Sequence, residues 1–354
     1  MKKYLILILL MIAACAEPPT DATHNPVDKP TRGALILCEG LWHYENSRID
    51  LYNFENNEYY EDYYDAANNG RPLGDVANHI VLLGDTALIA MTSSNIIEAV
   101  DVRSGLSIAR LEFAENLAPR HIAIVSDSSA WFSSLFKHAI YEFDPRSLRL
   151  TGRRIQTGPA PEDIIYINGK IFTANSGYGD YLYDREGAGT ISVIDPIAGV
   201  ETDRLWCGPN PMRLAAAPDG RHLVAAYFNL PSRPDSAGGV VIYNIRTLER
   251  VDSARLMLTP LSRIAVDSEY IYCITRSGIM QFLISNSKLN GKLIIQNPDT
   301  SEFWLALAAS PDGRIWTGNA RNYHIGGEIR IYSSYGNLLH TLQTGMNPSS
   351  IIFF

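Results

Sequence analysis

Charged side chains recur near the start of successive apolar segments, in most cases just after a proline. The set comprises Asp75, Arg120, His121, Glu162, Asp163, Arg213 and Arg263. Positive and negative groups at equivalent positions suit a polar ligand with anionic and hydrogen-bonding groups. The alternative is that these charges pair with one another and hold neighbouring repeats in register.

Aromatic and amide side chains gather in four longer segments, at residues 40–45, 175–184, 228–235 and 319–324. The candidate ligand contacts within them are Trp42, Tyr44, Asn175, Tyr178, Tyr181, Phe228 and Tyr323. Flat rings beside hydrogen-bonding groups suit a planar or sugar-like ligand better than a metal ion. The alternative is that these rings fold back and cover their own repeat.

Motifs for catalysis or metal binding are missing from the sequence. The histidines from His43 to His340 show no i,i+2 or i,i+4 pairing, and no GxSxG or phosphate-binding loop occurs in a suitable context. We therefore predict no catalytic residue, no metal ligand and no cofactor. An enzyme remains the alternative if Glu162, Asp163, Asn175 and Asn229 converge on an ion.

The N-terminus has the pattern of a lipoprotein signal. Two lysines precede about nine apolar residues, too few to cross a bilayer, and Ala13-Ala14-Cys15 follows. This ending is typical of a bacterial lipobox, in which the thiol receives diacylglycerol. We predict a signal peptide at 1–14, lipidation of Cys15 and a proline-rich tether at 15–32. The alternative is an ordinary signal peptide with a chance cysteine.

Composition narrows the class of protein. A net charge of −8 argues against nucleic acid as a partner. Cys38, Cys207 and Cys273 form no CxxC motif, and the apolar surroundings of Cys38 and Cys273 favour buried free thiols. The alternative is one disulfide between two of these three cysteines, which an environment outside the cytoplasm would permit.

A repeat of propeller-blade length runs through the chain. Seven apolar strand starts lie 42 to 50 residues apart, at Val76, Ile122, Ile164, Leu214, Ile264, Leu307 and Ile351. Each unit has room for four short antiparallel strands separated by turns such as Asn168-Gly169 and Asp219-Gly220. We predict an all-β, seven-bladed β-propeller over residues 33–354; a solenoid is the alternative.

The ends of the repeat predict how the ring closes. The chain stops one strand into its last unit, while the N-terminal part from Ala34 begins one strand late. The C-terminal strand should therefore complete the N-terminal blade, which limits exposed strand edges. The tyrosine-rich segment 59–64 is expected on the outermost strand of that blade, with its charges in solvent or, alternatively, facing a partner.

These features resemble a known family. Gly70-Arg71-Pro72-Leu73-Gly74-Asp75-Val76, Ala118-Pro119-Arg120-His121-Ile122 and Gly189-Thr190-Ile191-Ser192-Val193-Ile194-Asp195 are similar to the repeats of YncE-like, or YVTN-type, propellers. Together with Cys15, the chain resembles the lipoprotein propellers of Bacteroidetes-type bacteria, including the BtuG-like group. That resemblance implies a surface-exposed outer-membrane lipoprotein that binds a corrinoid and hands it to a TonB-dependent transporter.

The functional expectation is a binding protein that does not act as an enzyme. It would capture a small molecule, with a corrinoid such as cobalamin as the candidate, and pass it to an outer-membrane transporter. Its partners would be the ligand, the transporter and, through the lipid, the membrane. The alternatives are a surface protein-interaction scaffold and a hydrolase or lyase with a metal at the channel mouth.

Overall fold

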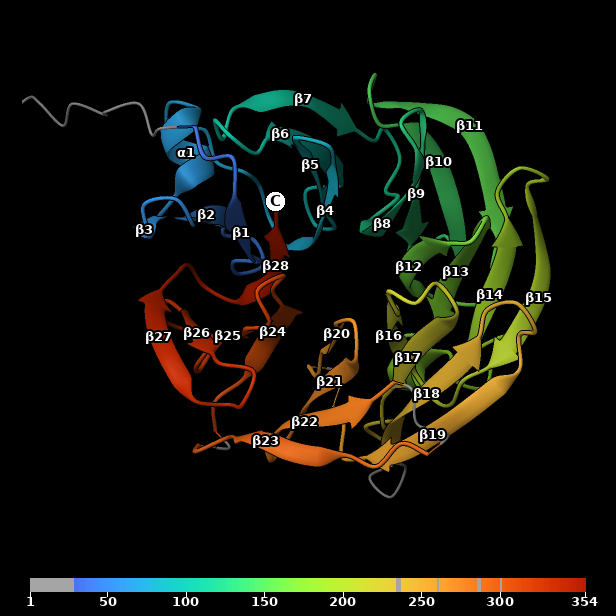
Figure 1. Ribbon diagram of the computed structural model, residues 1–354. Coiled ribbons are helices and arrows are strands. Elements are labelled where there is room, and N and C mark those ends of the chain that lie inside the picture. Colours follow the sequence, from blue (N-terminus) through green and yellow to red (C-terminus); the bar gives the residue numbers. More distant parts are fainter. Residues whose placement is uncertain (1–28, 234–236, 260, 285–287, 300) are drawn as a thin grey trace, which may run out of the picture.

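Seven four-stranded antiparallel sheets, arranged as blades around one axis, make up the computed structural model (Figure 1). The structure describes residues 29–354 apart from 234–236, 260, 285–287 and 300. The predicted seven-bladed propeller with four strands per blade is confirmed. Cys15, the signal peptide and most of the tether lie outside the described residues.

The first three blades, each given from its innermost strand outward, are built as follows. The first contains β28 (Pro348–Phe353), β1 (Gly33–Cys38), β2 (Arg48–Asn53) and β3 (Glu58–Tyr60). The second contains β4 (Ala77–Leu83), β5 (Thr86–Met91), β6 (Ile96–Asp101) and β7 (Ser107–Glu112). The third contains β8 (Pro119–Ser126), β9 (Ser129–Ser134), β10 (Ala139–Asp144) and β11 (Arg149–Gln156).

The other four blades follow the same order. The fourth contains β12 (Pro161–Ile167), β13 (Lys170–Asn175), β14 (Thr190–Asp195) and β15 (Val200–Trp206). The fifth contains β16 (Pro211–Ala216), β17 (His222–Tyr227), β18 (Gly238–Asn244) and β19 (Arg250–Leu256). The sixth contains β20 (Ile264–Val266), β21 (Tyr270–Thr275), β22 (Gly278–Leu283) and β23 (Lys292–Gln296). The seventh contains β24 (Trp304–Ala309), β25 (Ile315–Asn319), β26 (Glu328–Tyr332) and β27 (Leu338–Gln343).

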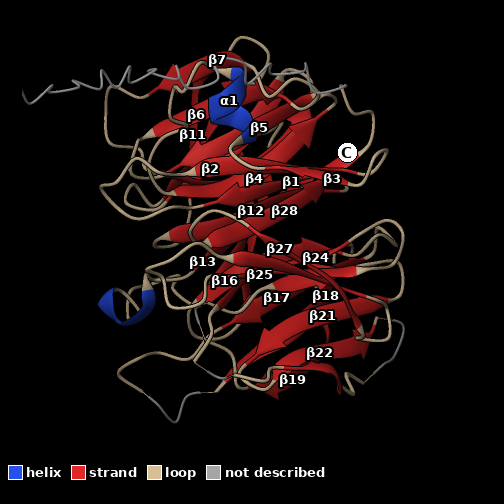
Figure 2. Ribbon diagram, turned by 90° about the vertical axis from the view of Figure 1, so that its left-hand side faces the viewer, coloured by secondary structure: helices blue, strands red, loops and turns tan. Residues whose placement is uncertain are grey.

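The core lies between the blades rather than inside one central cluster. Phe172 and Val193 of the fourth blade pack with Leu223 and Val241 of the fifth, for example. Second and third strands are therefore apolar on both faces, whereas outermost strands such as β15 expose most of their residues. Figure 2, turned by 90°, shows the connecting loops at the two ends of the strands.

Ring closure follows the predicted arrangement. The C-terminal strand β28 pairs antiparallel with β1, with Ala34 opposite Phe353 and Leu37 opposite Ser350. Two backbone hydrogen bonds of 3.0 Å between Gly33 and Phe354 extend this ladder. The two ends of the propeller, blue and red in Figure 1, thus share one blade.

The tyrosine-rich segment differs from the prediction. The outermost strand β3 ends at Tyr60, and helix α1 (Tyr63–Ala67) begins three residues later. Tyr63 and Tyr64 are buried, and the Tyr64 hydroxyl donates a 2.9 Å hydrogen bond to Oε1 of Glu98 in the second blade. Burial of these two rings between blades is favourable, and a solvent-exposed strand would forgo it; the segment therefore forms a helical turn.

Two further observations concern the whole described chain. Cys38, Cys207 and Cys273 are buried free thiols, as predicted for Cys38 and Cys273, and burial raises the pKa of Cys207 to about 12. Within the residues that the structure describes, no helix has the length and apolar character needed to span a membrane.

Candidate functional site

The start of the innermost strands and the long loops lie at the same end of the blades. In the fourth blade Pro161, at the start of β12, pairs with Asn175 at the end of β13. Pro211 pairs with Tyr227 in the fifth blade by the same register. We call this end of the ring the mouth face; it carries both the charged set and the aromatic loops identified in the sequence.

A β-bulge follows the first residue of several innermost strands. The ladder skips two residues between Pro119 and Ile122 and two between Pro161 and Ile164. A bulge bends its strand and interrupts the alternation of side chains between the two faces of the sheet. Two consecutive side chains can therefore point toward the same neighbouring blade. Arg120 with His121, and Glu162 with Asp163, occupy these bulges.

Each bulged residue of the third blade pairs with a bulged residue of the fourth. Nε and Nη2 of Arg120 donate to Oε2 of Glu162 at 2.9 and 2.8 Å. Glu162 is buried, and Arg120 is half-buried. Burial lowers the pKa of Arg120, but the Glu162 and Glu39 carboxylates outweigh burial and raise it. This pair holds two neighbouring blades in register, in line with the structural role considered for these charges.

Asp163 connects three blades. Its Oδ1 accepts a hydrogen bond from Nδ1 of His121 at 2.8 Å and another from the backbone N–H of the next residue, Ile164, at 2.9 Å. Its Oδ2 accepts the N–H of Leu214, in the fifth blade, at 2.8 Å. Burial alone would raise the pKa of Asp163, but His121 and these donors lower it to about 2.

His79 extends this arrangement into the second blade. Its ring stacks on that of His121, with the centroids 4.4 Å apart. The backbone N–H of Ile122 donates to its Nδ1 at 3.1 Å. Burial, followed by the charge of His121, lowers the pKa of His79 to about 3. His79 is therefore neutral, with its proton on Nε2, at any pH near 7.

Glu39 supplies a second carboxylate to the mouth face. It follows β1 directly, and its Oε1 accepts a 2.7 Å hydrogen bond from Nδ2 of Asn78. Burial raises its pKa, and the opposing charges of Arg120, Arg263 and Arg213 reduce that rise. Glu39 thus lies within electrostatic reach of three arginines from three different blades.

Arg213 and Arg263 are the least satisfied charges of this cluster. Among the described residues, neither has a carboxylate within the 4.0 Å of an ion pair. Burial lowers the pKa of Arg213, and burial together with the charge of Arg213 lowers the pKa of Arg263 to about 9. The Glu162, Asp163 and Glu39 carboxylates oppose the lowering at Arg213, and Glu39 opposes it at Arg263, but burial outweighs them in both cases.

Exposed rings lie on two long loops of the mouth face, one in the first blade and one in the fourth. Trp42 is 67% exposed and Tyr181 is 80% exposed; Tyr44 is 70% exposed and Tyr178 45%. The rings of Tyr178 and Tyr181 lie 5.3 Å apart, next to the 3-10 helix η1 (Gly179–Tyr181). These side chains are free to contact a ligand on the mouth face, which is the role that the sequence predicts for them.

Tyr323 lies deeper than those four rings. It is half-buried, its ring centroid is 4.9 Å from that of Phe303, and it is close enough to Arg263 for that charge to act on its pKa. Burial still raises the pKa of Tyr323 to about 12. The hydroxyl therefore stays protonated and can donate or accept a hydrogen bond near Arg263.

Two of the predicted contacts, Phe228 and Asn175, are buried within the blades instead of exposed on the mouth face. Phe228 is completely buried, in the apolar cluster between the fifth and sixth blades. Its backbone N–H donates to the carbonyl of Asn210, which holds the residue at the end of the blade instead of in the loop. Asn175 is also buried, and its amide donates to Ser192 and Thr190 within its own blade.

Sequence reasoning missed Glu39 and His79 as members of the site. Glu39 occupies the position directly after a second strand, where the other blades carry residues such as Thr92 and Ser176. A carboxylate at that position, next to Gly40, could have identified Glu39 as a site residue from the sequence. His79 follows Asn78 at the bulge of β4, equivalent to His121 on β8, so aligning the bulges would also have found it.

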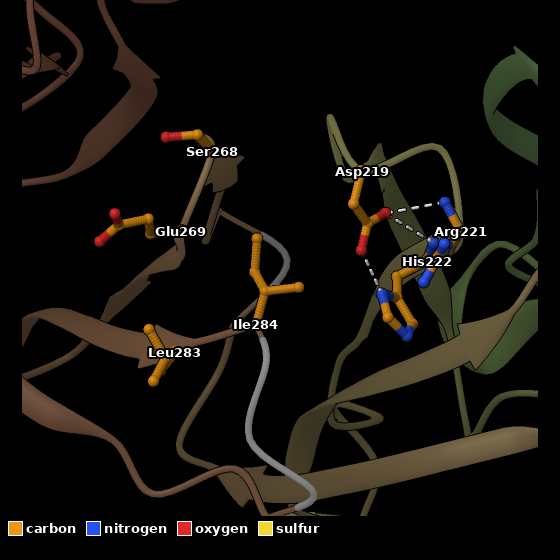
Figure 3. Close-up of a pocket in the computed structure, with 7 residues that line it drawn as sticks. All are labelled: Asp219, Arg221, His222, Ser268, Glu269, Leu283 and Ile284. Atoms are coloured by element: carbon orange, nitrogen blue, oxygen red, sulfur yellow. Dashed lines mark hydrogen bonds and ion pairs between the residues drawn. The ribbon is translucent and has the colours of Figure 1, made fainter.

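The opposite face carries a hollow of about 750 Å³ at the turns of the fifth and sixth blades (Figure 3). There the Asp219 carboxylate accepts the backbone N–H of Arg221 at 2.7 Å and Nδ1 of His222 at 2.5 Å. These bonds close the predicted Asp219-Gly220 turn, so the polar groups are used locally. Across the described residues, no group of three or more His, Cys, Asp or Glu is arranged to hold a metal ion.

Comparisons with known proteins identify the fold. No protein-family model and no curated protein matches the sequence. A quinoprotein alcohol dehydrogenase-like protein from Bacteroides thetaiotaomicron is similar in structure, with a TM-score of 0.69 and 18% identity over 92% of this chain and 78% of its own. Hydrazine synthase from Kuenenia stuttgartiensis matches with a TM-score of 0.63 and 16% identity over 77% of this chain and 88% of its own.

A third similar structure is BamB from Moraxella catarrhalis, with a TM-score of 0.52 and 15% identity over 79% of this chain and 78% of the other. At these identities the likeness extends to the fold alone. The chain is therefore a seven-bladed β-propeller whose mouth face carries an inter-blade cluster of ionisable side chains.

Proposed function

We propose that this protein is a lipid-anchored β-propeller of the cell envelope that binds a small molecule on its mouth face. The bound molecule is then passed, unchanged, to an outer-membrane transporter. Cys15 provides the anchor, and the tether at 15–32 lets the propeller reach the transporter. In this proposal the protein is surface-exposed.

One observation carries the proposal. Five side chains from five blades form a charged cluster on the mouth face, and each lies within electrostatic reach of at least two of the others: Glu39, Arg120, Glu162, Arg213 and Arg263. Two loops of the same face present exposed rings. A charged centre with an aromatic rim gives a ligand both orientation and apolar contact area.

A corrinoid fits this pattern of groups. Its broad ring carries amide arms, which need hydrogen-bond donors and acceptors as well as flat apolar contact. Tyr178, Tyr181 and Trp42 would cover the ring, and the polar centre would bind the arms. The sequence resemblance to corrinoid-binding lipoprotein propellers supports the same ligand class.

Calorimetric titration of the purified full-length protein in detergent, with cobalamin and with cobinamide, tests this proposal. We expect a Kd below about 1 µM for at least one of them. Trp42→Ala and Tyr178→Ala should each weaken binding at least about tenfold, since a buried aromatic contact contributes on the order of 1–2 kcal/mol.

Tyr335→Ala is the matched control, because Tyr335 is an exposed ring, 86% in solvent, on a turn of the opposite face. It should leave both titrations unchanged. An absence of heat with both corrinoids would rule out this ligand class. Equal losses in Tyr335→Ala and Tyr178→Ala would show that the mouth face is not the binding surface.

A further inference from the structure

Two arginines on adjacent blades have hydrogen-bond donors that have no partner among the described residues. Nη1 of Arg213 donates to the carbonyl of Met212 at 2.8 Å, while its Nε is buried without a partner. The residue is 8% exposed. A guanidinium has five N–H donors and no acceptor, so a buried unpaired Nε is costly unless a ligand accepts from it.

Arg263 is held in a similar way. Its Nη1 donates to the carbonyls of Leu261 and Ser262 at 2.9 and 3.3 Å. These bonds hold the guanidinium against the chain that leads into β20, and no described residue accepts a hydrogen bond from its Nε or Nη2. β20 lies beside β16, the strand of Arg213, in the inner ring.

The nearby carboxylates are committed to other partners. Glu162 accepts both bonds from Arg120, and Asp163 accepts from His121 and two backbone N–H groups. Glu39 accepts from Asn78. Burial and then the charge of Arg213 lower the pKa of Arg263, and the opposing charge of Glu39 does not cancel these two effects.

A mostly apolar groove, with Arg276 and Glu302 also in its lining, lies on the mouth face next to the chain that leads into β20. It encloses about 530 Å³, and its wall includes Leu261, Ile274, Phe303 and Trp304. Ser262, the residue before Arg263, also lines it. Trp304 is 3% exposed, and its buried indole Nε1 has no hydrogen-bond partner among the described residues.

We infer that Arg213 and Arg263 bind the oxyanion of a small molecule, a carboxylate or a phosphate, whose apolar part occupies the groove lined by Phe303 and Trp304. This inference rests on the proposed small-molecule function and names the chemistry of its ligand. Guanidinium groups match both oxyanions through paired, charge-assisted hydrogen bonds. The apolar wall of the groove favours an apolar group in the rest of the ligand.

Titrations with simple aromatic probes test the inference without the natural ligand. Full-length protein in detergent is titrated with phenyl phosphate, benzoate, inorganic phosphate and the neutral benzyl alcohol. We expect at least one aromatic anion to bind about tenfold or more tightly than benzyl alcohol, and more tightly than inorganic phosphate. The stronger of phenyl phosphate and benzoate identifies the preferred oxyanion.

Variants locate the binding groups. Arg213→Gln and Arg263→Gln should each weaken the aromatic anion at least about tenfold, and Arg263→Lys should recover part of the loss. Arg221→Gln, on the opposite face, is the matched control and should bind like the wild type. Thermal unfolding and circular dichroism of each variant separate a lost contact from a lost fold.

The outcomes separate this inference from the function on which it rests. Equal binding of the anion and benzyl alcohol, or wild-type affinity in folded Arg213→Gln and Arg263→Gln, would overturn the arginine site. Inorganic phosphate binding as tightly as phenyl phosphate would overturn the role of the groove. If no anion binds while a corrinoid does, the anion inference fails and the proposed function stands.

Discussion

Replacing Asp163 by asparagine is the sharpest test of how the mouth face is held together. The two carboxylate oxygens accept hydrogen bonds from His121, Ile164 and Leu214, which lie on three blades. Asparagine keeps one oxygen and replaces the other with an NH₂ group. At least one of the three donors then faces another donor in a buried place.

Two lines of reasoning give the size of the effect. The pKa of Asp163 falls from 3.8 to about 2, which corresponds to roughly 2 kcal/mol of stabilisation of the charged form. Losing one hydrogen bond to a charged acceptor costs about 1.5–3 kcal/mol. We therefore expect Asp163→Asn to lower the free energy of unfolding by about 2–3 kcal/mol at pH 7.

Denaturant unfolding of the wild type and the variant measures this difference, with Asp219→Asn as the control. Asp219 also accepts three hydrogen bonds, but it lies in an exposed turn, so its replacement should cost much less. A group with a depressed pKa stabilises the fold above its unfolded pKa and loses that effect as the pH falls. The Asp163→Asn difference should shrink between about pH 5 and pH 2. An unchanged stability at pH 7 would refute this account.

Two other outcomes follow from the buried groups. Between about pH 6.5 and pH 3, His79 binds a proton in the unfolded chain but not in the folded protein. The free energy of unfolding should therefore decrease as the pH is lowered, by up to about 1.4 kcal/mol per pH unit. His79→Asn should flatten that slope in denaturant unfolding across the pH range; an unaltered slope would contradict the assignment. Phe228→Ala should lower the free energy of unfolding by about 3–5 kcal/mol, because the ring is part of the core. A loss below about 1 kcal/mol in denaturant unfolding would place Phe228 outside the core.

The fold was predictable because its signals are local and repeated. Pairs such as Asn168-Gly169 and Asp219-Gly220 form turns in the structure as the sequence predicts, with positive φ at both glycines. The count of strand starts then determined the number of blades. The incomplete first and last units predicted the pairing of β28 with β1.

The details of the site depend on features that a sequence shows poorly. Strict alternation would direct Arg120 and His121 to opposite faces, but the bulge brings both into contacts with the fourth blade. Partner choice among Glu39, Glu162 and Asp163 depends on distances between blades, which spacing along the chain does not contain. Phe228 was misplaced because β17 ends one residue before it, while packing keeps its ring between blades.

The shared first blade has a consequence for the order in which the protein is made. Strand β1 is buried along its whole length, and its inner neighbour β28 is formed by residues near the very end of the chain. During synthesis, the edge of β1 that β28 later covers stays unpaired while the other blades emerge. The first blade in sequence is therefore the last to be completed. Until β28 has been made, this apolar edge is a place where nascent chains can aggregate.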